Sequence, residues 1–262
     1  MITLRQFFGF DTDPRVPEGW LSWQQLTYVT CIVLITVLLA VILGKRYRKR
    51  TEAEKRVPLR VAAVLMLASE IAKITIVCIR YNDPWQFRSM LPLFLCSIIF
   101  FSLPVAAFGK GRISRSAMCF TFVYGMLCCL AGTYLAANIY QNSPIFSYEP
   151  MASNFAHCVA GFAAVYIGVS GLVKREPGDL AIMSLMLGIF EALALTADLL
   201  QAGTGYEHNY MFFTRPDGTP FTVLMNLAGG IQPLYTVLVA AVYFVYLYLF
   251  LFIMKKLSRR HS

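Results

Sequence analysis

Seven apolar runs, each close to twenty residues long, occupy most of this chain and restrict what it can fold into. A helix needs about 20 residues to cross the ~30 Å hydrocarbon core of a bilayer. The sequence therefore predicts an all-α, polytopic membrane protein with about seven transmembrane helices. The predicted spans are Leu26–Gly44, Leu59–Cys78, Leu91–Phe108, Ala117–Ala137, Ser153–Val173, Leu180–Leu200 and Leu234–Met254.

The composition excludes a soluble domain and a nucleic-acid-binding protein. Hydrophobic residues make up 58% of the chain and charged residues only 14%, against about 25% charged in an ordinary soluble domain. The formal charge of +9 would suit nucleic acid, but most Lys and Arg lie in short segments between apolar runs. This placement is typical of membrane topology signals, so no nucleic acid is expected as a partner.

Basic residues alternate between the two ends of successive runs, and this alternation predicts the orientation. Lys and Arg concentrate after the first, third, fifth and seventh runs. The positive-inside rule then places the N-terminus outside and the C-terminus in the cytoplasm of a multi-pass cell-membrane protein. The predicted parts are an extracytoplasmic segment 1–25, a seven-helix membrane domain 26–254 and a basic cytoplasmic tail 255–262. The run Lys45–Arg50 is expected to contact anionic lipid headgroups.

The short apolar stretch Phe221–Gly230 is not counted as a span. Gly229, Gly230 and Pro233 interrupt it before the last run begins. We expect it to lie at the membrane interface or to re-enter. Aromatic residues of the last run, Tyr243 among them, are expected to pack against other helices or to contact lipid.

Charged side chains within the predicted spans need a partner or a function, because one at mid-bilayer costs at least ~2.5–3.5 kcal/mol. Glu70 and Lys73 are three residues apart, so they share a helix face and partly neutralise one another. Glu191 and Asp198 are seven residues apart, two turns along one face.

The predicted topology gathers these polar groups toward the outer end of the domain. Cys96 and His157 each lie about 6–8 Å inside the expected outer ends of their spans. Asp198 lies near the outer end of its run, and the following loop carries Asn209 and Tyr210. We therefore expect one outward-opening pocket with Gln201–Pro220 as its rim. Its predicted substrate-binding residues are Glu70, Lys73, Asp198, Asn209 and Tyr210.

The seven cysteines favour neither a metal site nor a disulfide framework, because they lie within or at the ends of apolar runs and form no CxxC pair. We expect no metal and no cofactor. A cysteine in an apolar helix is usually a small packing residue. A nearby histidine changes this reading for Cys96, since a base converts a thiol into a nucleophile.

Three ordered blocks resemble the YwaF family of bacterial multi-pass proteins. They are Ser69–Lys73 with Leu91–Ile98, then Asn154–Cys158, and Asn209–Phe213 leading to Pro216. Phe94 stands where that family usually has His, and Gly230–Tyr235 lacks its tryptophans. The family is similar to a eukaryotic transmembrane Cys/His phospholipid acyltransferase and, more distantly, to the androgen-induced lipid hydrolases. This resemblance implies Cys96 as nucleophile and His157 as general base.

Three functional hypotheses remain open from the sequence. The first is a lipid acyltransferase or lipid-ester hydrolase, whose partners are membrane lipids. The second is a transporter or small-molecule-binding protein that uses the intramembrane carboxylates. The third is a non-catalytic membrane subunit, which the replacement of His by Phe94 favours. The sequence makes no prediction of oligomeric state.

Overall fold

The computed structural model describes residues 2–11, 15–176, 178–217 and 219–258, and all regular structure within these ranges is helical. Six helices are long and apolar enough to cross a membrane, or seven if one bent pair counts as a span. The predicted all-α membrane fold is confirmed. Its helices are α1 (Leu4–Phe8), α2 (Trp23–Tyr47), α3 (Glu52–Lys55), α4 (Val57–Tyr81), α5 (Ile99–Phe108), α6 (Gly111–Tyr134), α7 (Ala137–Asn142), α8 (Tyr148–Ser170), α9 (Asp179–Gln201), α10 (Thr222–Leu227) and α11 (Gln232–Ser258).

The chain divides into two compact units. Unit 1 comprises Met1–Leu91 and Ile99–Asp179, and unit 2 comprises Pro92–Ile98 and Leu180–Ser262. The short segment Pro92–Ile98 therefore belongs to unit 2 although both of its flanks belong to unit 1.

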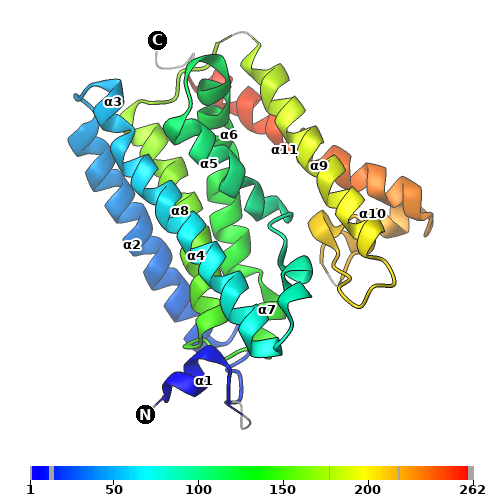
Figure 1. The fold of residues 1–262 in the computed structure, drawn as a ribbon. Helices are drawn as coiled ribbons and strands as arrows, with labels where there is room; N and C mark the ends of the chain where they lie inside the picture. The colour runs from blue at the N-terminus through cyan, green and yellow to red at the C-terminus, as the bar shows by residue number, and fades with distance from the viewer. Residues whose placement is uncertain (1, 12–14, 177, 218, 259–262) are drawn as a thin grey trace. The chain divides into compact units, whose positions relative to one another are not determined.

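Helix α8 is the centre of unit 1, where it packs against α2, α4 and α6 (Figure 1). Glycines bring these backbones close together. A Cβ added at Gly125 of α6 would lie 2.5 Å from the Ala160 carbonyl oxygen of α8. A Cβ added at Gly161 of α8 would lie 2.6 Å from the Cys129 sulfur of α6. Small residues at such contacts allow the close helix packing that is typical inside membranes.

The predicted continuous third helix over Leu91–Phe108 is wrong. Residues 91–94 are not helical, and helical structure begins with the 3-10 turn η2 (Leu95–Ile98) that leads into α5. The preceding 3-10 helix η1 (Pro84–Met90) is bent by 98° from this helical segment. Pro92 explains the break, because proline disfavours helical geometry in the residue before it. The remaining 14 residues from Leu95 to Phe108 extend about 23 Å, less than a bilayer core.

Helix α8 begins five residues before its predicted start at Ser153. Glu149 and Pro150 occupy the first turn, where an acidic side chain suits the helix dipole and proline loses no helical hydrogen bond. The helix ends at Gly171, whose φ of 73° gives the left-handed cap that favours glycine.

Unit 2 contains α9, α10 and α11 with the loops that connect them. Helix α10 has six residues, so the stretch Phe221–Gly230 is too short to cross a membrane, as predicted. A longer loop joins α9 to α10 and contains the 3-10 turn η3 (Tyr210–Phe212).

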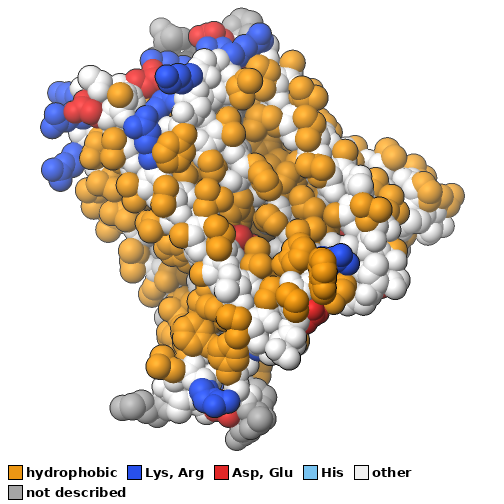
Figure 2. Space-filling view, in the orientation of Figure 1, with side chains coloured by type: hydrophobic (Ala, Val, Ile, Leu, Met, Phe, Trp, Pro, Cys, Tyr) orange, Lys and Arg blue, Asp and Glu red, His pale blue; other side chains and the backbone are white. Residues whose placement is uncertain are grey.

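Lys and Arg side chains gather at the end of unit 1 that carries α3, while hydrophobic side chains cover the helices below it (Figure 2). This asymmetry underlies the predicted orientation, which stays a prediction. Arg259 and Arg260 of the predicted basic tail lie outside the described residues.

Candidate functional site

Unit 2 brings together two of the sequence blocks that the resemblance singled out. The Phe94 ring lies 5.3 Å from the Tyr210 ring and 5.7 Å from the His208 ring, both in edge-on arrangements. Cys96 lies two residues after Phe94, in η2, and is partly buried. The segment with the predicted nucleophile thus packs against the loop with the predicted rim residues.

Asn209 shapes this loop through its side chain. Its amide nitrogen donates to the Arg215 carbonyl oxygen at 2.6 Å and to the Asp217 carboxylate at 2.7 Å. Its amide oxygen accepts from the Thr214 backbone N–H at 2.9 Å and from the Thr214 hydroxyl at 2.8 Å. These bonds use both amide hydrogens of the side chain. Asn209 therefore has a structural role in the loop, and its predicted contact with substrate stays a prediction.

Helix α11 holds the loop in an uncommon backbone conformation. Met211 and Phe212 have φ values of 54° and 60°, which non-glycine residues rarely adopt. The Tyr243 and Tyr235 hydroxyls donate to the carbonyl oxygens of Met211 and Phe212, each at 2.8 Å. The expected role of Tyr243 as a packing or lipid-contacting residue is therefore incomplete. Its buried hydroxyl is a specific donor to a strained turn.

Two carboxylates on α9 are buried without full pairing. Asp198 is 4% exposed and Glu191 is 8% exposed. One Asp198 oxygen accepts from the Tyr210 backbone N–H at 2.8 Å. The other Asp198 oxygen and the Glu191 Oε1 have no hydrogen-bond partner among the described residues. A buried polar atom without a partner is costly, so these two atoms indicate a role outside packing.

In unit 1 the predicted pair of Glu70 and Lys73 is confirmed. The Lys73 Nζ lies 2.7 Å from the Glu70 carboxylate, and both side chains lie on α4. The two charges neutralise one another within the apolar helix.

His157 of α8 has a defined tautomer. Its Nδ1 lies 2.7 Å from the Ser153 carbonyl oxygen, one helical turn earlier. A carbonyl oxygen only accepts, so Nδ1 carries the proton and Nε2 keeps its lone pair. His157 is nine residues from the start of α8, about 14 Å along the helix, because α8 begins earlier than predicted; the predicted depth of 6–8 Å inside the span stays a prediction.

Gly132 positions the histidine, although no sequence pattern singled it out. A Cβ added at Gly132 of α6 would collide with the His157 ring at Cδ2 and Nε2. Glycine at this position leaves the space that the imidazole occupies. The signal in the sequence was a lone glycine in an apolar run, which only acquires this meaning once α6 and α8 pack together.

The predicted site residues divide between the units. Cys96, Asp198, Asn209 and Tyr210 belong to unit 2, whereas Glu70, Lys73 and His157 belong to unit 1. One pocket shared by all seven stays a prediction. Across the described part of the chain, His, Cys, Asp and Glu side chains form no group of three or more that could hold a metal ion.

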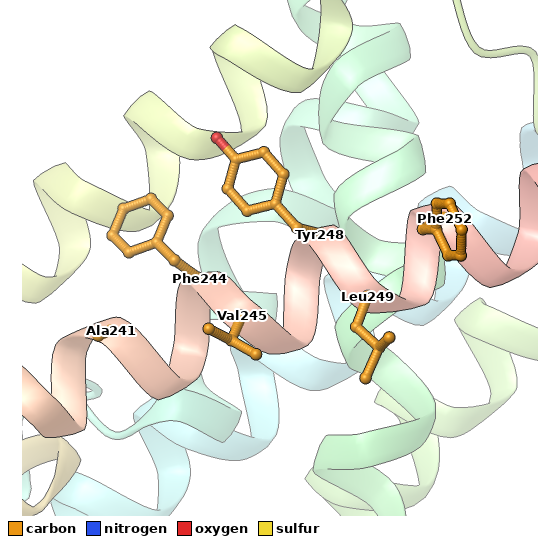
Figure 3. Close-up of a pocket in the computed structure, with 6 residues that line it drawn as sticks. All are labelled: Ala241, Phe244, Val245, Tyr248, Leu249 and Phe252. Atoms are coloured by element: carbon orange, nitrogen blue, oxygen red, sulfur yellow. The ribbon is translucent and has the colours of Figure 1, made fainter.

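A shallow groove of about 630 Å³ runs along one face of α11 (Figure 3). Its lining is aliphatic and aromatic, and no predicted site residue is among the described residues that line it. The Tyr248 hydroxyl, its one hydroxyl group, lies 3.2 Å from the Ser184 hydroxyl of α9. The groove offers an apolar surface and no reactive group. It is lined by Ala241, Phe244, Val245, Tyr248, Leu249 and Phe252.

Comparison with known proteins gave one match. The model of the TMEM164 family matches residues 20–251, which is most of the chain. No curated protein and no solved structure matches the sequence.

Proposed function

This chain belongs to the TMEM164 family, and from that premise we propose that it is an integral membrane enzyme that transfers or hydrolyses the acyl chains of lipids. Cys96 is the nucleophile and His157 is the general base. The proposal also rests on the resemblance of three sequence blocks to YwaF proteins. It includes a location in the cell membrane, the outward-facing N-terminus and contact between Lys45–Arg50 and anionic headgroups.

The contact of the His157 Nδ1 with the Ser153 carbonyl oxygen is the observation that carries this proposal. A general base must present a lone pair, and the bond from Nδ1 to the Ser153 carbonyl leaves that lone pair on Nε2. Gly132 leaves room for the same edge of the ring. The imidazole is thus held in the form that accepts a proton.

The reaction proceeds in two steps. The His157 Nε2 takes the Cys96 proton, the sulfur attacks the ester carbonyl carbon, and a thioester forms as the C–O bond breaks. The imidazolium returns this proton to the departing lipid alcohol. A second lipid hydroxyl, or water, then gives its proton to His157 and attacks the thioester, and the imidazolium returns the proton to the sulfur. Covalent transfer divides one difficult displacement into two easier ones. It requires Cys96 and His157 to reach the same ester.

The test is capture of the acyl chain on the protein. Purified protein in nanodiscs is incubated with a phospholipid that carries an alkyne-tagged acyl chain, and hydroxylamine-sensitive labelling is measured. We expect labelling of the wild-type protein, none of Cys96→Ala, and at least about a hundredfold slower labelling of His157→Ala. Cys31→Ala, which changes an exposed cysteine, is the matched control. Lipid turnover at the wild-type rate in both Cys96→Ala and His157→Ala would overturn the proposal.

Gly132→Ala tests the position of the imidazole without removing it. The added methyl group must displace the His157 ring or separate α6 from α8. We expect slower labelling with the fold retained, as judged by helical circular dichroism and gel filtration. Gly188→Ala is the control, because its Cβ would meet nothing closer than the Phe244 ring at 3.8 Å.

A transporter or small-molecule-binding protein is the second candidate, and the unpaired oxygens of Asp198 and Glu191 favour it. Uptake of a labelled solute by proteoliposomes, with no acyl capture, would replace the first proposal with this one. If proteoliposomes show neither uptake nor capture, the non-catalytic subunit becomes the better interpretation.

A further inference from the structure

The buried face of α9 carries two carboxylates, Asp198 and Glu191, that form no ion pair with the described residues. Asp198 and Glu191 lie two helical turns apart on one face, and each is more than nine-tenths buried. Each has one oxygen without a hydrogen-bond partner among the described residues. Glu70 of unit 1 differs, because Lys73 neutralises it directly.

The basic side chain of the loop that bonds to Asp198 is paired elsewhere. The Arg215 Nε donates to the Asp217 carboxylate at 2.6 Å. The Arg215 side chain is 61% exposed, so it lies at the surface of the loop. The second oxygen of Asp198 has no hydrogen-bond partner among the described residues.

Aromatic rings lie around Tyr210, whose backbone N–H donates to Asp198. The Tyr210 ring contacts the rings of Phe94 and His208. The Phe94 ring also lies 6.2 Å from the Phe212 ring. The Tyr243 hydroxyl donates to the carbonyl oxygen of the adjacent Met211. Asp198 and these rings are therefore parts of one region of unit 2, and Glu191 lies two turns before Asp198 on the same face of α9.

We propose that Asp198 and Glu191 bind the ammonium group of an amine-bearing ligand, with aromatic rings of unit 2 at its sides. Aromatic faces attract large, weakly hydrated cations, and carboxylates supply the opposite charge. Ca²⁺ and Mg²⁺ take six or more oxygen ligands, and among the described residues His, Cys, Asp and Glu side chains form no group of three or more that could hold a metal ion. Asp198 is the primary contact, and Glu191, deeper along α9, adds negative potential.

The ammonium group has two sources, a phospholipid headgroup or a free amine. If the ligand is a lipid, the inference rests on the proposed function and gives its substrate a cationic headgroup. Binding itself requires no catalysis, so it is measured without turnover.

The first experiment measures binding of choline to the purified wild-type protein by saturation-transfer NMR. Its neutral isostere, 3,3-dimethyl-1-butanol, has the same shape without the charge. We expect choline to bind at least about tenfold more tightly than the isostere, since a charged contact contributes more than about 1.4 kcal/mol. Equal binding of the two molecules would overturn the proposal, and this arm needs no variant to fold.

The second experiment removes each carboxylate while keeping its shape. We expect Asp198→Asn to weaken choline binding at least about tenfold and Glu191→Gln to weaken it by about threefold. Glu207→Gln is the control, because Glu207 is an exposed acid of the same loop and should leave binding unchanged. Wild-type choline binding by both Asp198→Asn and Glu191→Gln would overturn the assignment.

The third experiment separates the two sources and the two proposals. Nanodiscs of dioleoylphosphatidylcholine or dioleoylphosphatidylglycerol are compared by native mass spectrometry for lipid retained on the protein. Preferential retention of the choline lipid, lost in Asp198→Asn, supports a headgroup, and choline binding without lipid preference supports a free amine. Cys96→Ala should lose acyl capture and keep choline binding. If choline binds but wild-type protein captures no acyl chain, only the proposed function fails.

Discussion

In unit 1 the buried Glu70 has Lys73 at 2.7 Å, whereas in unit 2 the buried Asp198 and Glu191 each keep an oxygen without a partner in the described part of the chain. The two central helices of unit 1 are also the most enclosed. Half or more of the most apolar 18-residue stretch of α6 and of α8 is buried, against 17–28% for α2 and α4 of the same unit and for α9 and α11 of unit 2. Unit 1 therefore has the features of a scaffold, and unit 2 has unsatisfied groups available to a ligand.

The loop 209–217 extends this contrast. Unit 1 holds its helices by close backbone contacts at glycines, which change little without moving a whole helix. Unit 2 holds its strained turn by single side-chain hydrogen bonds from α11. Bonds of this kind open one at a time, so we expect the loop to be the more adaptable element.

The largest expected effect comes from removing one charge in each unit. Lys73→Met leaves Glu70 buried and unpaired, which should cost about 3 kcal/mol of stability. Asp198→Asn keeps the oxygen that accepts from Tyr210 and removes an unpaired charge, so it should cost less than about 1 kcal/mol. Unfolding by sodium dodecyl sulfate in mixed micelles measures both. The double variant Glu70→Gln/Lys73→Met should recover most of the loss. Equal losses for the two single variants would remove the contrast between the units.

The next effect compares two glycines in long helices. Gly125→Ala places a methyl group 2.5 Å from a backbone oxygen of α8, so the helices must separate at a cost of about 1–3 kcal/mol. Gly188→Ala in α9 meets only the edge of the Phe244 ring at 3.8 Å, and alanine should stabilise that helix by up to about 1 kcal/mol. Thermal unfolding in detergent should shift in opposite directions. A neutral Gly125→Ala would show that the contact between α6 and α8 is less rigid than its geometry indicates.

The smallest effect concerns two tyrosines of α11. Tyr243→Phe removes the donor to the Met211 carbonyl, so the turn should lose about 1 kcal/mol of local stability. Hydrogen exchange at residues 209–214 should speed up severalfold. Tyr248→Phe is the control, since its hydroxyl contacts Ser184 and its ring is 48% exposed. Unchanged exchange in Tyr243→Phe would mean that Tyr235 and the other contacts of α11 suffice to hold the turn.

Local patterns predicted much of the fold. Long apolar runs predicted the long helices, since a helix that faces lipid must be apolar around most of its surface. The spacing of Glu70 and Lys73 predicted their ion pair, because residues three apart always share a helix face. The prediction of a continuous third span was wrong even though Pro92 is present in the sequence, because the apolar content of a segment does not reveal a break at a proline.

The candidate site was predicted less completely. The sequence identified Cys96, His157, Asp198 and Tyr210 as residues that need an explanation, but it could not choose their partners. That Tyr210 bonds to Asp198 and packs against Phe94 depends on segments far apart in the chain. Gly132 acquired a role only because α8 places an imidazole beside it.

The sequence by itself determined an all-helical membrane protein and the residues within its helices that carry charge. These properties follow from hydrophobicity and from the 3.6-residue period, which act over a few neighbouring residues. Only the tertiary structure decided that Asp198 accepts from the Tyr210 N–H and that Asp198 and Glu191 each keep an oxygen without a partner among the described residues. Those outcomes depend on donors and acceptors from other segments, whose approach is set by the packing of whole helices.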